Sequence, residues 1–196
     1  MIKGLRGGAA IILLCVPTAA RAVEFSADAV FHGSRGATGT NKVNVSNGKI
    51  RVQPVGDPAY EIFDNAKQID YIIVPPKKLI LAQGPNTAHL RGARYNVGAD
   101  LCAKISIPAA PAVCTKQGLD KVGGRVVEKW QFTRTTVHGR HLASTIWIDR
   151  SLDAIVRVVW GGRVSYELLN VHFGPQAASL FAIPRNFQIK QMADPK

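Results

Sequence analysis

Apolar and polar residues alternate along most of the chain, which predicts β-strands with one buried face. Residues 25–31 show this alternation, with phenylalanine and alanine at every second position. The strongest local signal is in residues 42–53, where Asn47 and Gly48 suit a two-residue type I′ turn. Such a turn places Val45 opposite Ile50, so that apolar residues face apolar ones across the pair. We therefore expect a β-hairpin here.

Further strands are expected on both sides of an irregular stretch, residues 84–116, in which a helix over residues 86–95 is only weakly signalled. Residues 167–169 change the apolar face of a long strand, which suggests a bulge or bend. The tail reads as a short helical turn that ends before Pro184. The expected strands lie within 60–64, 68–74, 78–83, 125–134, 143–149, 154–160 and 163–173.

About ten strands joined by short turns imply a mainly β protein with an antiparallel sheet, because helical segments for parallel crossovers are missing. A sheet of this size must curl, split into two packed sheets or close. No internal repeat divides the sequence. Residues 23–196 are therefore expected to form a single domain with a sizeable core.

The first 22 residues have the layout of a secretory signal peptide. A basic start is followed by a short apolar core at residues 9–16 and by an A-x-A signal that predicts cleavage after Ala22. Cys15 follows Leu14, which is too large for a lipoprotein signal, so lipidation is not expected. We expect a periplasmic protein, with secretion as the other outcome, and no transmembrane segment in residues 23–196.

The chain is basic, with a formal net charge of +12 that falls to +9 once Lys3, Arg6 and Arg21 leave with the leader. Anionic envelope surfaces are therefore expected neighbours. Nucleic acid is not expected as a partner, because the basic residues are dispersed and the three tryptophans lie in apolar strands rather than on a basic platform.

Cys102 and Cys114 are the two cysteines of residues 23–196. They could form a disulfide, half of a metal site, or a reactive pair. An exported protein favours a disulfide. A structural zinc site would need about four ligands, and no partner motif accompanies the pair. We expect the disulfide to hold a lid-like loop over the sheet, with Ile105, Ile107 and Val113 facing inward.

Few residues indicate catalysis, and no recognised catalytic or nucleotide-binding motif is present. His138 and His141 could ligate a metal only with a third ligand, and an exposed hairpin tip explains them better. Asp149 and Asp153 flank a turn, where aspartate commonly bonds its own backbone. The sequence thus predicts neither a catalytic residue nor a metal site nor a cofactor, although the role of the two histidines stays open.

Glu128 and Glu167 interrupt apolar strand faces, and a carboxylate in that position requires a basic partner such as Arg157. A structural ion pair is the favoured interpretation, with catalysis as the alternative.

Residues 23–196 contain, in this order, the segments FSADAV, NGKIRVQ, YEIFDNAKQIDYIIVPPKKLI, GGRVVEKWQFT, ASTIWIDRSLDAIVRVVW and SYELLNVHFGPQAASLFAIPRNFQI. This order resembles that of the LolA/LolB-like periplasmic lipoprotein carriers, and most closely that of small exported proteins of the DUF4412 type. The resemblance covers nearly all of residues 23–196. It implies an unclosed antiparallel barrel, with one or two short helices on its concave face, whose cavity shelters acyl chains.

The resulting expectation is a non-enzymatic exported protein that binds a lipid, a lipoprotein or another apolar ligand inside a half-barrel. The alternatives are an envelope structural or protein-interaction module without a small ligand and, third, a secreted hydrolase. The apolar residues expected to line the ligand site are Val126, Trp130, Phe132, Ile146, Trp147, Val158 and Trp160.

Overall fold

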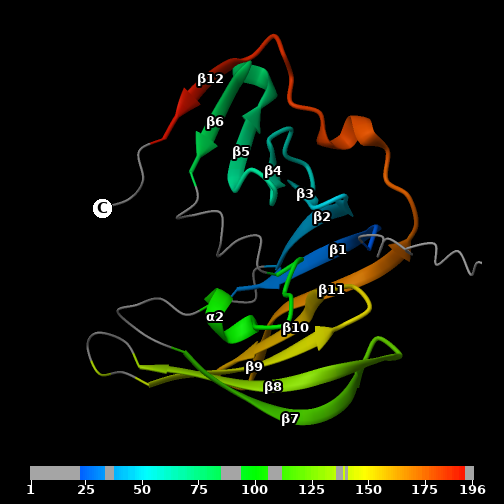
Figure 1. The fold of residues 1–196 in the computed structure, drawn as a ribbon, viewed down its shortest axis with the longest axis vertical. Helices are drawn as coiled ribbons and strands as arrows, with labels where there is room; N and C mark the ends of the chain where they lie inside the picture. Colours follow the sequence, from blue (N-terminus) through cyan, green and yellow to red (C-terminus); the bar gives the residue numbers. More distant parts are fainter. Residues whose placement is uncertain are drawn as a thin grey trace, which may run out of the picture.

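The computed structural model describes residues 23–33, 38–84, 94–105, 112–135, 139 and 141–192. These residues form one twelve-stranded sheet with few helices (Figure 1). The strands are β1 (Phe25–His32), β2 (Thr38–Ser46), β3 (Lys49–Pro54), β4 (Tyr60–Asp64), β5 (Ile69–Val74), β6 (Leu79–Gln83), β7 (Ala112–Val122), β8 (Arg125–Thr135), β9 (His141–Asp149), β10 (Ala154–Trp160), β11 (Arg163–Phe173) and β12 (Gln188–Gln191), and the helices are η1 (Pro75–Lys77), α2 (Leu101–Ile105) and η2 (Ala178–Phe181).

The sheet consists of two meanders joined in the middle. Strands β1 to β6 lie side by side in chain order, as do β7 to β11, and β1 pairs with β11. Every neighbouring pair is antiparallel except β12 with β6. The spatial order is β12-β6-β5-β4-β3-β2-β1-β11-β10-β9-β8-β7, so β12 and β7 are the two edges and the sheet does not close into a barrel.

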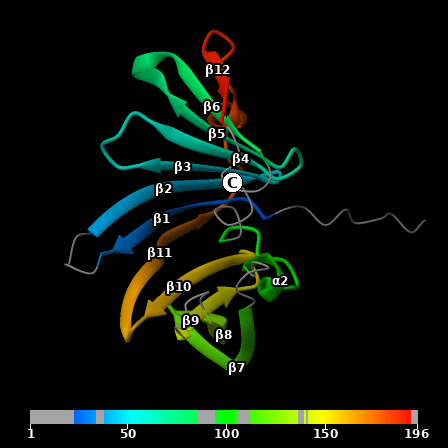
Figure 2. The ribbon, with the colours of Figure 1, turned by 90° about the vertical axis from the view of Figure 1, so that its left-hand side faces the viewer.

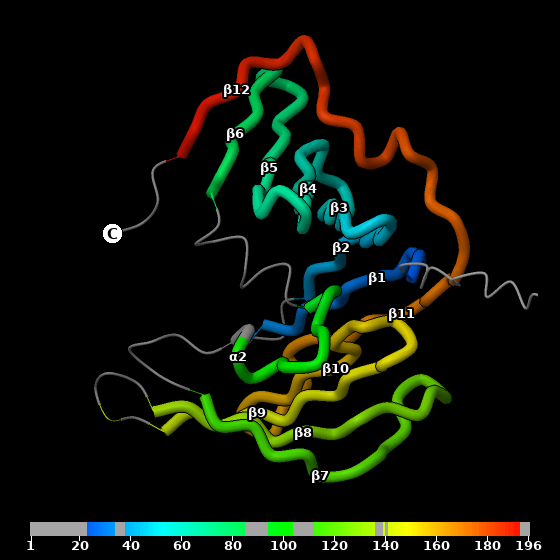
Figure 3. Tube along the Cα trace, in the orientation of Figure 1, coloured from blue at the N-terminus to red at the C-terminus, as the bar shows by residue number. Residues whose placement is uncertain are grey.

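This strand order requires the chain to cross the sheet twice. After β6 it must reach β7 at the far edge, and after β11 it must return to β12 beside β6. We call the side that carries Ala29, Ile146 and Tyr166 the inner face, and the side that carries Trp147 and Glu167 the outer face. The segment with α2 lies on the concave, inner side (Figure 2). The C-terminal segment runs from β11 to β12 along the other side of the first meander (Figure 3).

The hairpin predicted for residues 42–53 is confirmed as β2 and β3. Val45 pairs with Ile50, as the turn requires. Asn47 and Gly48 have φ values of 49° and 72°, the positive values of a type I′ turn. Phe25, at the start of the neighbouring strand, is fully buried, as its alternating pattern predicts.

The main core fills the inner face and includes the crossing segment. Tyr95, Val97 and Leu101 are at most 5% exposed and pack into the same cluster as the strand residues. The hydroxyl of Tyr166 donates to the hydroxyl of Tyr95 at 3.3 Å, which satisfies a buried polar group. A second cluster lies on the outer face of the first meander, where the C-terminal segment covers Ile62, Ile73 and Ile80 together with Ile183 and Phe187.

The expected fold class is confirmed, with differences of detail. Twelve strands are present rather than about ten, because Ala112–Val122 and Gln188–Gln191 are also strands. The expected bulge lies at Asn170, slightly beyond residues 167–169. Of the two short helices, α2 covers the inner face, whereas η2 lies against outer-face Arg51, which donates to the carbonyl of Leu180.

Two other expectations fall mostly on residues outside the described ranges. The signal peptide of residues 1–22 lies entirely outside them, as does most of the weakly signalled helix at residues 86–95. Among the described residues, no helix has the length and apolar character that a membrane crossing requires.

Candidate functional site

Residues 94–105, which we call the lid, are fastened to the turn between β9 and β10. The amide of Val97 donates to the carbonyl of Asp153 at 3.0 Å, and the amide of Ile155 donates to the carbonyl of Arg94 at 2.8 Å. The amide of Gly98 donates to the Asp153 carboxylate at 2.7 Å. These bonds satisfy backbone groups that would otherwise be buried without partners. The first half of the lid is therefore an integral part of the inner face.

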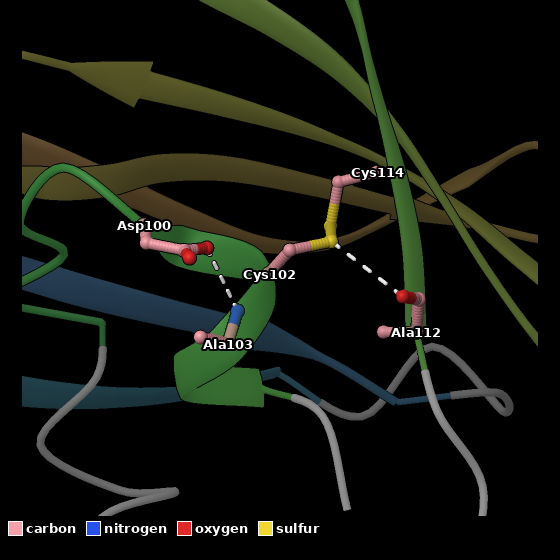
Figure 4. The surroundings of a disulfide bond; sticks show 5 residues. All are labelled: Asp100, Cys102, Ala103, Ala112 and Cys114. Atoms are coloured by element: carbon pink, nitrogen blue, oxygen red, sulfur yellow. Dashed lines mark hydrogen bonds between the residues drawn. A yellow bond between two sulfur atoms is a disulfide. The ribbon is translucent and has the colours of Figure 1, made fainter.

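The second half of the lid is held by the disulfide between Cys102 in α2 and Cys114 in β7 (Figure 4). The expected pairing is thus confirmed. Asp100 accepts a hydrogen bond from the amide of Ala103 at 2.9 Å and so caps the N-terminus of α2. Leu101 of the lid packs into the main core and is 2% exposed, and its burial contributes roughly 1.5–3 kcal/mol.

The lid expected from the sequence was the loop from Cys102 to Cys114, and residues 106–111 of that loop lie outside the described residues, so its lid role stays a prediction. One of the residues expected to face inward is wrongly placed. Val113 is 63% exposed and pairs with Thr133 on the outer face, because its neighbour Cys114 points inward to reach Cys102. Adjacent residues of a strand point to opposite faces. The side chains of Ile105 and Ile107 lie outside the described part of the structure.

An ion-pair network connects the lid to the inner face of β8. Arg150 donates from Nε to Glu128 at 2.8 Å and from Nη1 to the carbonyl of Gly98 in the lid at 2.6 Å. Lys116 binds the other carboxylate oxygen of Glu128 at 2.5 Å, and the indole of Trp130 donates at 3.1 Å. Partial burial by itself raises the pKa of Glu128, but these three donors outweigh it and hold that pKa at about 2.

A hollow of about 520 Å³ lies beside this network. Its lining includes Leu119 and Val126, which are 70% and 61% exposed, and the ion pair of Arg150 with Glu128. Leu119 pairs with Glu128 across β7 and β8, so both side chains lie on the inner face. The volume falls within the range of ligand sites, about 300–1,000 Å³. The hollow thus combines accessible apolar side chains with a polar connection to the lid.

The seven apolar residues proposed from the sequence do not share one face. Six have inner-face positions in the register of β8, β9 and β10, whereas Trp147 pairs with Lys129 and Arg157 on the outer face. Of the six, Val126 lines the hollow, while Phe132 and Ile146 are buried in the core. Trp130 and Val158 are half-buried, and Trp160 is 45% exposed at the far end of β10. Their role in ligand binding stays a prediction.

Trp147 has a structural environment on the outer face. Its indole donates to Asp120 at 2.9 Å, and the cations of Lys129 and Arg157 lie 5.5 and 5.8 Å from its ring. Arg157 also bonds Glu167 at 2.7 Å, which confirms the ion pair expected for Glu167. Glu128 has different partners from the one expected, because Arg157 points to the opposite face.

The polar residues considered for catalysis have structural partners. Asp149 bonds Arg125 and accepts from the amide of Ser151 at 2.9 Å, so it stabilises its own turn as expected. Burial raises the pKa of Asp149, but Arg125 and Ser151 lower it overall. His141 is exposed, and His138 lies outside the described residues. No group of three potential metal ligands occurs within the described ranges.

Three residues of the site were missed by sequence reasoning: Lys116, Leu119 and Arg150. A usable signal was the Gly123-Gly124 pair, whose φ values of 56° and 77° make the turn between β7 and β8. Recognising that turn would have placed Leu119 opposite Glu128. Arg150 had no such signal, because its contact with the lid depends on the fold.

Comparisons with known proteins identify the fold and not a family. No family model matches the chain, and no curated protein matches it. The expected DUF4412-type relationship therefore stays a prediction.

Among solved structures, PNGF-II matches with a TM-score of 0.54 and 12% identity over 87% of this chain, and in a second crystal form with a TM-score of 0.50. The complex of MucB with MucA(peri) matches with a TM-score of 0.48 and 13% identity over 88% of this chain. The chain spans 31% of PNGF-II and 58% of MucB. At these identities, the likeness to PNGF-II shows a similar fold and nothing more. The sheet of this chain is unclosed, as the LolA/LolB-like resemblance implies.

Proposed function

We propose that this protein is a non-enzymatic, exported binding protein that takes up an apolar group, such as the acyl chain of a lipid or lipoprotein, at the inner-face hollow. The observation that carries the proposal is the exposure of Leu119 and Val126 inside a hollow of about 520 Å³ next to the lid. Burying such side chains against an acyl chain gains about 0.8 kcal/mol for each CH₂ removed from water.

The arrangement of the lid supports reversible access to this hollow. Arg150 connects the carbonyl of Gly98 to Glu128 through polar contacts at the edge of the hollow, and its side chain is 36% exposed. If a ligand displaces Arg150, Glu128 keeps its bonds to Lys116 and to the indole of Trp130. The lid then stays fastened by its backbone hydrogen bonds and by the disulfide.

The periplasmic location and the lack of enzymatic activity are parts of the same proposal. Export is supported by the basic start, apolar core and A-x-A signal of residues 1–22. Fractionation of cells followed by N-terminal sequencing tests it, with Val23 expected as the first residue of the exported protein. A binding role without chemistry is supported by the aspartate and glutamate contacts described above, which engage the candidate catalytic carboxylates in turns and ion pairs.

Binding is tested with dodecanoate as the probe, followed by native mass spectrometry of the full chain. Val126→Asp places a charge in the hollow and should weaken binding at least about tenfold, because the lost apolar contact is worth about 1.5–3 kcal/mol. Leu119→Asp should have a similar effect. Both side chains are largely exposed, so neither change should prevent folding.

Val113→Asp is the matched control. Val113 is as exposed as Val126, at 63%, but faces outward from β7. It should leave dodecanoate binding unchanged. Equal affinities for all three variants, or no binding to the wild type, would contradict the inner-face site.

A second candidate function, protein interaction without a small ligand, is favoured by the edge strand β7. This strand has eleven residues, and most of its side chains from Lys116 to Lys121 are exposed. Its free edge can accept a strand from another protein. However, Gly118, with φ of 125°, marks a register shift that interrupts the regular ladder, and such bulges protect edges. Crosslinking in cells separates the two functions, since a partner attached along β7 is expected only for the second.

A further inference from the structure

A second hollow, of about 280 Å³, lies on the outer face of β1, β2 and β11. It is separate from the inner-face hollow, because its side chains lie on the opposite side of the sheet. It is lined by six polar residues and by the apolar residues Ala27 and Val43. The polar residues around it are Ser26, Asp28, Lys42, Asn44, Asn170 and His172.

A β-bulge shapes this hollow. Ser26 pairs with His172, and Asp28 pairs with Leu169, so two residues of β11 oppose Ala27 of β1. One of the two, Asn170, has φ of 51°. Asparagine tolerates this left-handed conformation better than most residues, and bulges commonly re-aim a side chain beside a functional site. Here the bulge directs the amide of Asn170 to Asp28.

The groups around the hollow are joined by hydrogen bonds, which form its rim. Asn170 donates to one oxygen of Asp28 at 2.8 Å, and Lys42 donates to the other at 2.6 Å. These hydrogen bonds, with that of Asn170 the larger effect, keep the pKa of Asp28 below its usual value. On the other side, Asn44 donates to Gln176 of the C-terminal segment at 2.8 Å. The rim thus joins three strands to the segment that crosses the outer face.

The charge and chemistry of this hollow restrict its ligand. Its carboxylate and its ammonium group are bonded to each other, so together they contribute no net charge. The hollow therefore offers a small ion of either sign no net opposite charge. What is left for a ligand is a set of uncharged donors and acceptors: the hydroxyl of Ser26 and the amide oxygens of Asn44 and Asn170.

We propose that this outer-face hollow is a binding site for a neutral polyhydroxylated ligand of about one saccharide ring. Several hydroxyl groups on one small, uncharged molecule match the closely spaced neutral donors and acceptors. The volume lies at the small end of ligand sites, near 300 Å³, which accommodates one ring rather than an acyl chain. The site is independent of the proposed acyl-binding function.

The test is a titration of the ¹⁵N-labelled full chain with glucose and, separately, with N-acetylglucosamine, followed by NMR. The side-chain amide signals of Asn44 and Asn170 should shift and saturate at millimolar sugar. Ser26→Leu places an apolar side chain on the face that lines the hollow and should weaken binding at least tenfold. Asp28→Ala should also weaken it, and Asp57→Ala, in the turn after β3, is the matched control that should bind as the wild type does.

Amide shifts of the same size in the wild type and in Ser26→Leu would overturn the site. The site would also be overturned if neither sugar shifts the amide signals of the wild type. Sodium sulfate and calcium chloride are titrated in parallel, and saturable shifts of the same amides with a salt but not with a sugar would also overturn it. Asp28→Ala removes the ion pair with Lys42 and could prevent folding. In that case Ser26→Leu still tests the site. Dodecanoate binding at the inner face should be unchanged in both variants, so failure here is distinguishable from failure of the proposed function.

Discussion

Removal of the disulfide should destabilise the protein by about 3 kcal/mol. Cys102 and Cys114 are 12 residues apart, and closing a loop of this length lowers the entropy of the unfolded chain by an amount worth just under ~3 kcal/mol at 25 °C. For a domain of this size, each kcal/mol corresponds to about 2–4 °C in Tm. The double variant Cys102→Ala/Cys114→Ala should therefore melt roughly 6–12 °C lower.

The assay is urea unfolding and thermal unfolding followed by circular dichroism. The reference is Cys15→Ala, so that Cys102 and Cys114 are its only cysteines. The reduced reference protein should behave as the double variant does, because both lack the same covalent constraint. Hydrogen exchange should show the effect as faster exchange in α2 than in residues 94–98, which retain their bonds to the β9–β10 turn.

Two results would refute this reasoning. A loss of stability below about 1 kcal/mol would show that the disulfide does not constrain the unfolded chain as the loop length predicts. Thiol labelling of the native, unreduced protein at both cysteines would show that the bond is not formed. Equal exchange along the whole lid would instead show that its two halves open together.

The remaining predictions concern stability and its pH dependence. The ion pairs of Glu128 lower its pKa from 4.5 to about 2, so their contribution to the free energy of unfolding is complete above pH 4.5 and is lost as the pH falls towards 2. Glu128→Gln should therefore flatten the fall of the unfolding free energy between pH 4.5 and pH 2. An unchanged slope would contradict the network. Leu152→Ala should cost about 2–5 kcal/mol in urea unfolding, because Leu152 is 1% exposed, and a loss below 1 kcal/mol would contradict tight packing under the lid. Gly48→Ala should cost about 1–2 kcal/mol, because φ is 72°, whereas Gly39→Ala, at a glycine with no positive φ and an open Cβ position, should cost less.

Local sequence patterns predicted the strands and one complete hairpin. The turn at Asn47 and Gly48 determines its own backbone geometry, and the alternation on both sides then leaves one register that pairs apolar residues. The disulfide was also predictable, because the expectation of export and the presence of two cysteines in residues 23–196 restrict the choices. These features depend on neighbouring residues or on composition, so they needed no knowledge of the fold.

The candidate site was predictable only in part. Val126 and Glu128 were identified as notable on β8, but the partners of Glu128, Lys116 and Arg150, come from β7 and from the turn after β9. Trp147 was grouped with the residues of the opposite face, although its neighbour Ile146 alternates with it. Which face of a strand turns inward depends on what covers it, and that information is not present in a short segment.

By itself, the sequence determined that this protein is an antiparallel β domain with short turns, since alternation and turn residues act over a few positions. Tertiary structure decided the order of the strands. Above all, it decided that β1 pairs with β11 and that β6 and β7 lie near opposite edges of the sheet. That separation requires the chain to cross the sheet, and the crossing segment forms the lid because its apolar residues bury the inner face. Such long-range pairing depends on burying whole faces together, and no local pattern contains it.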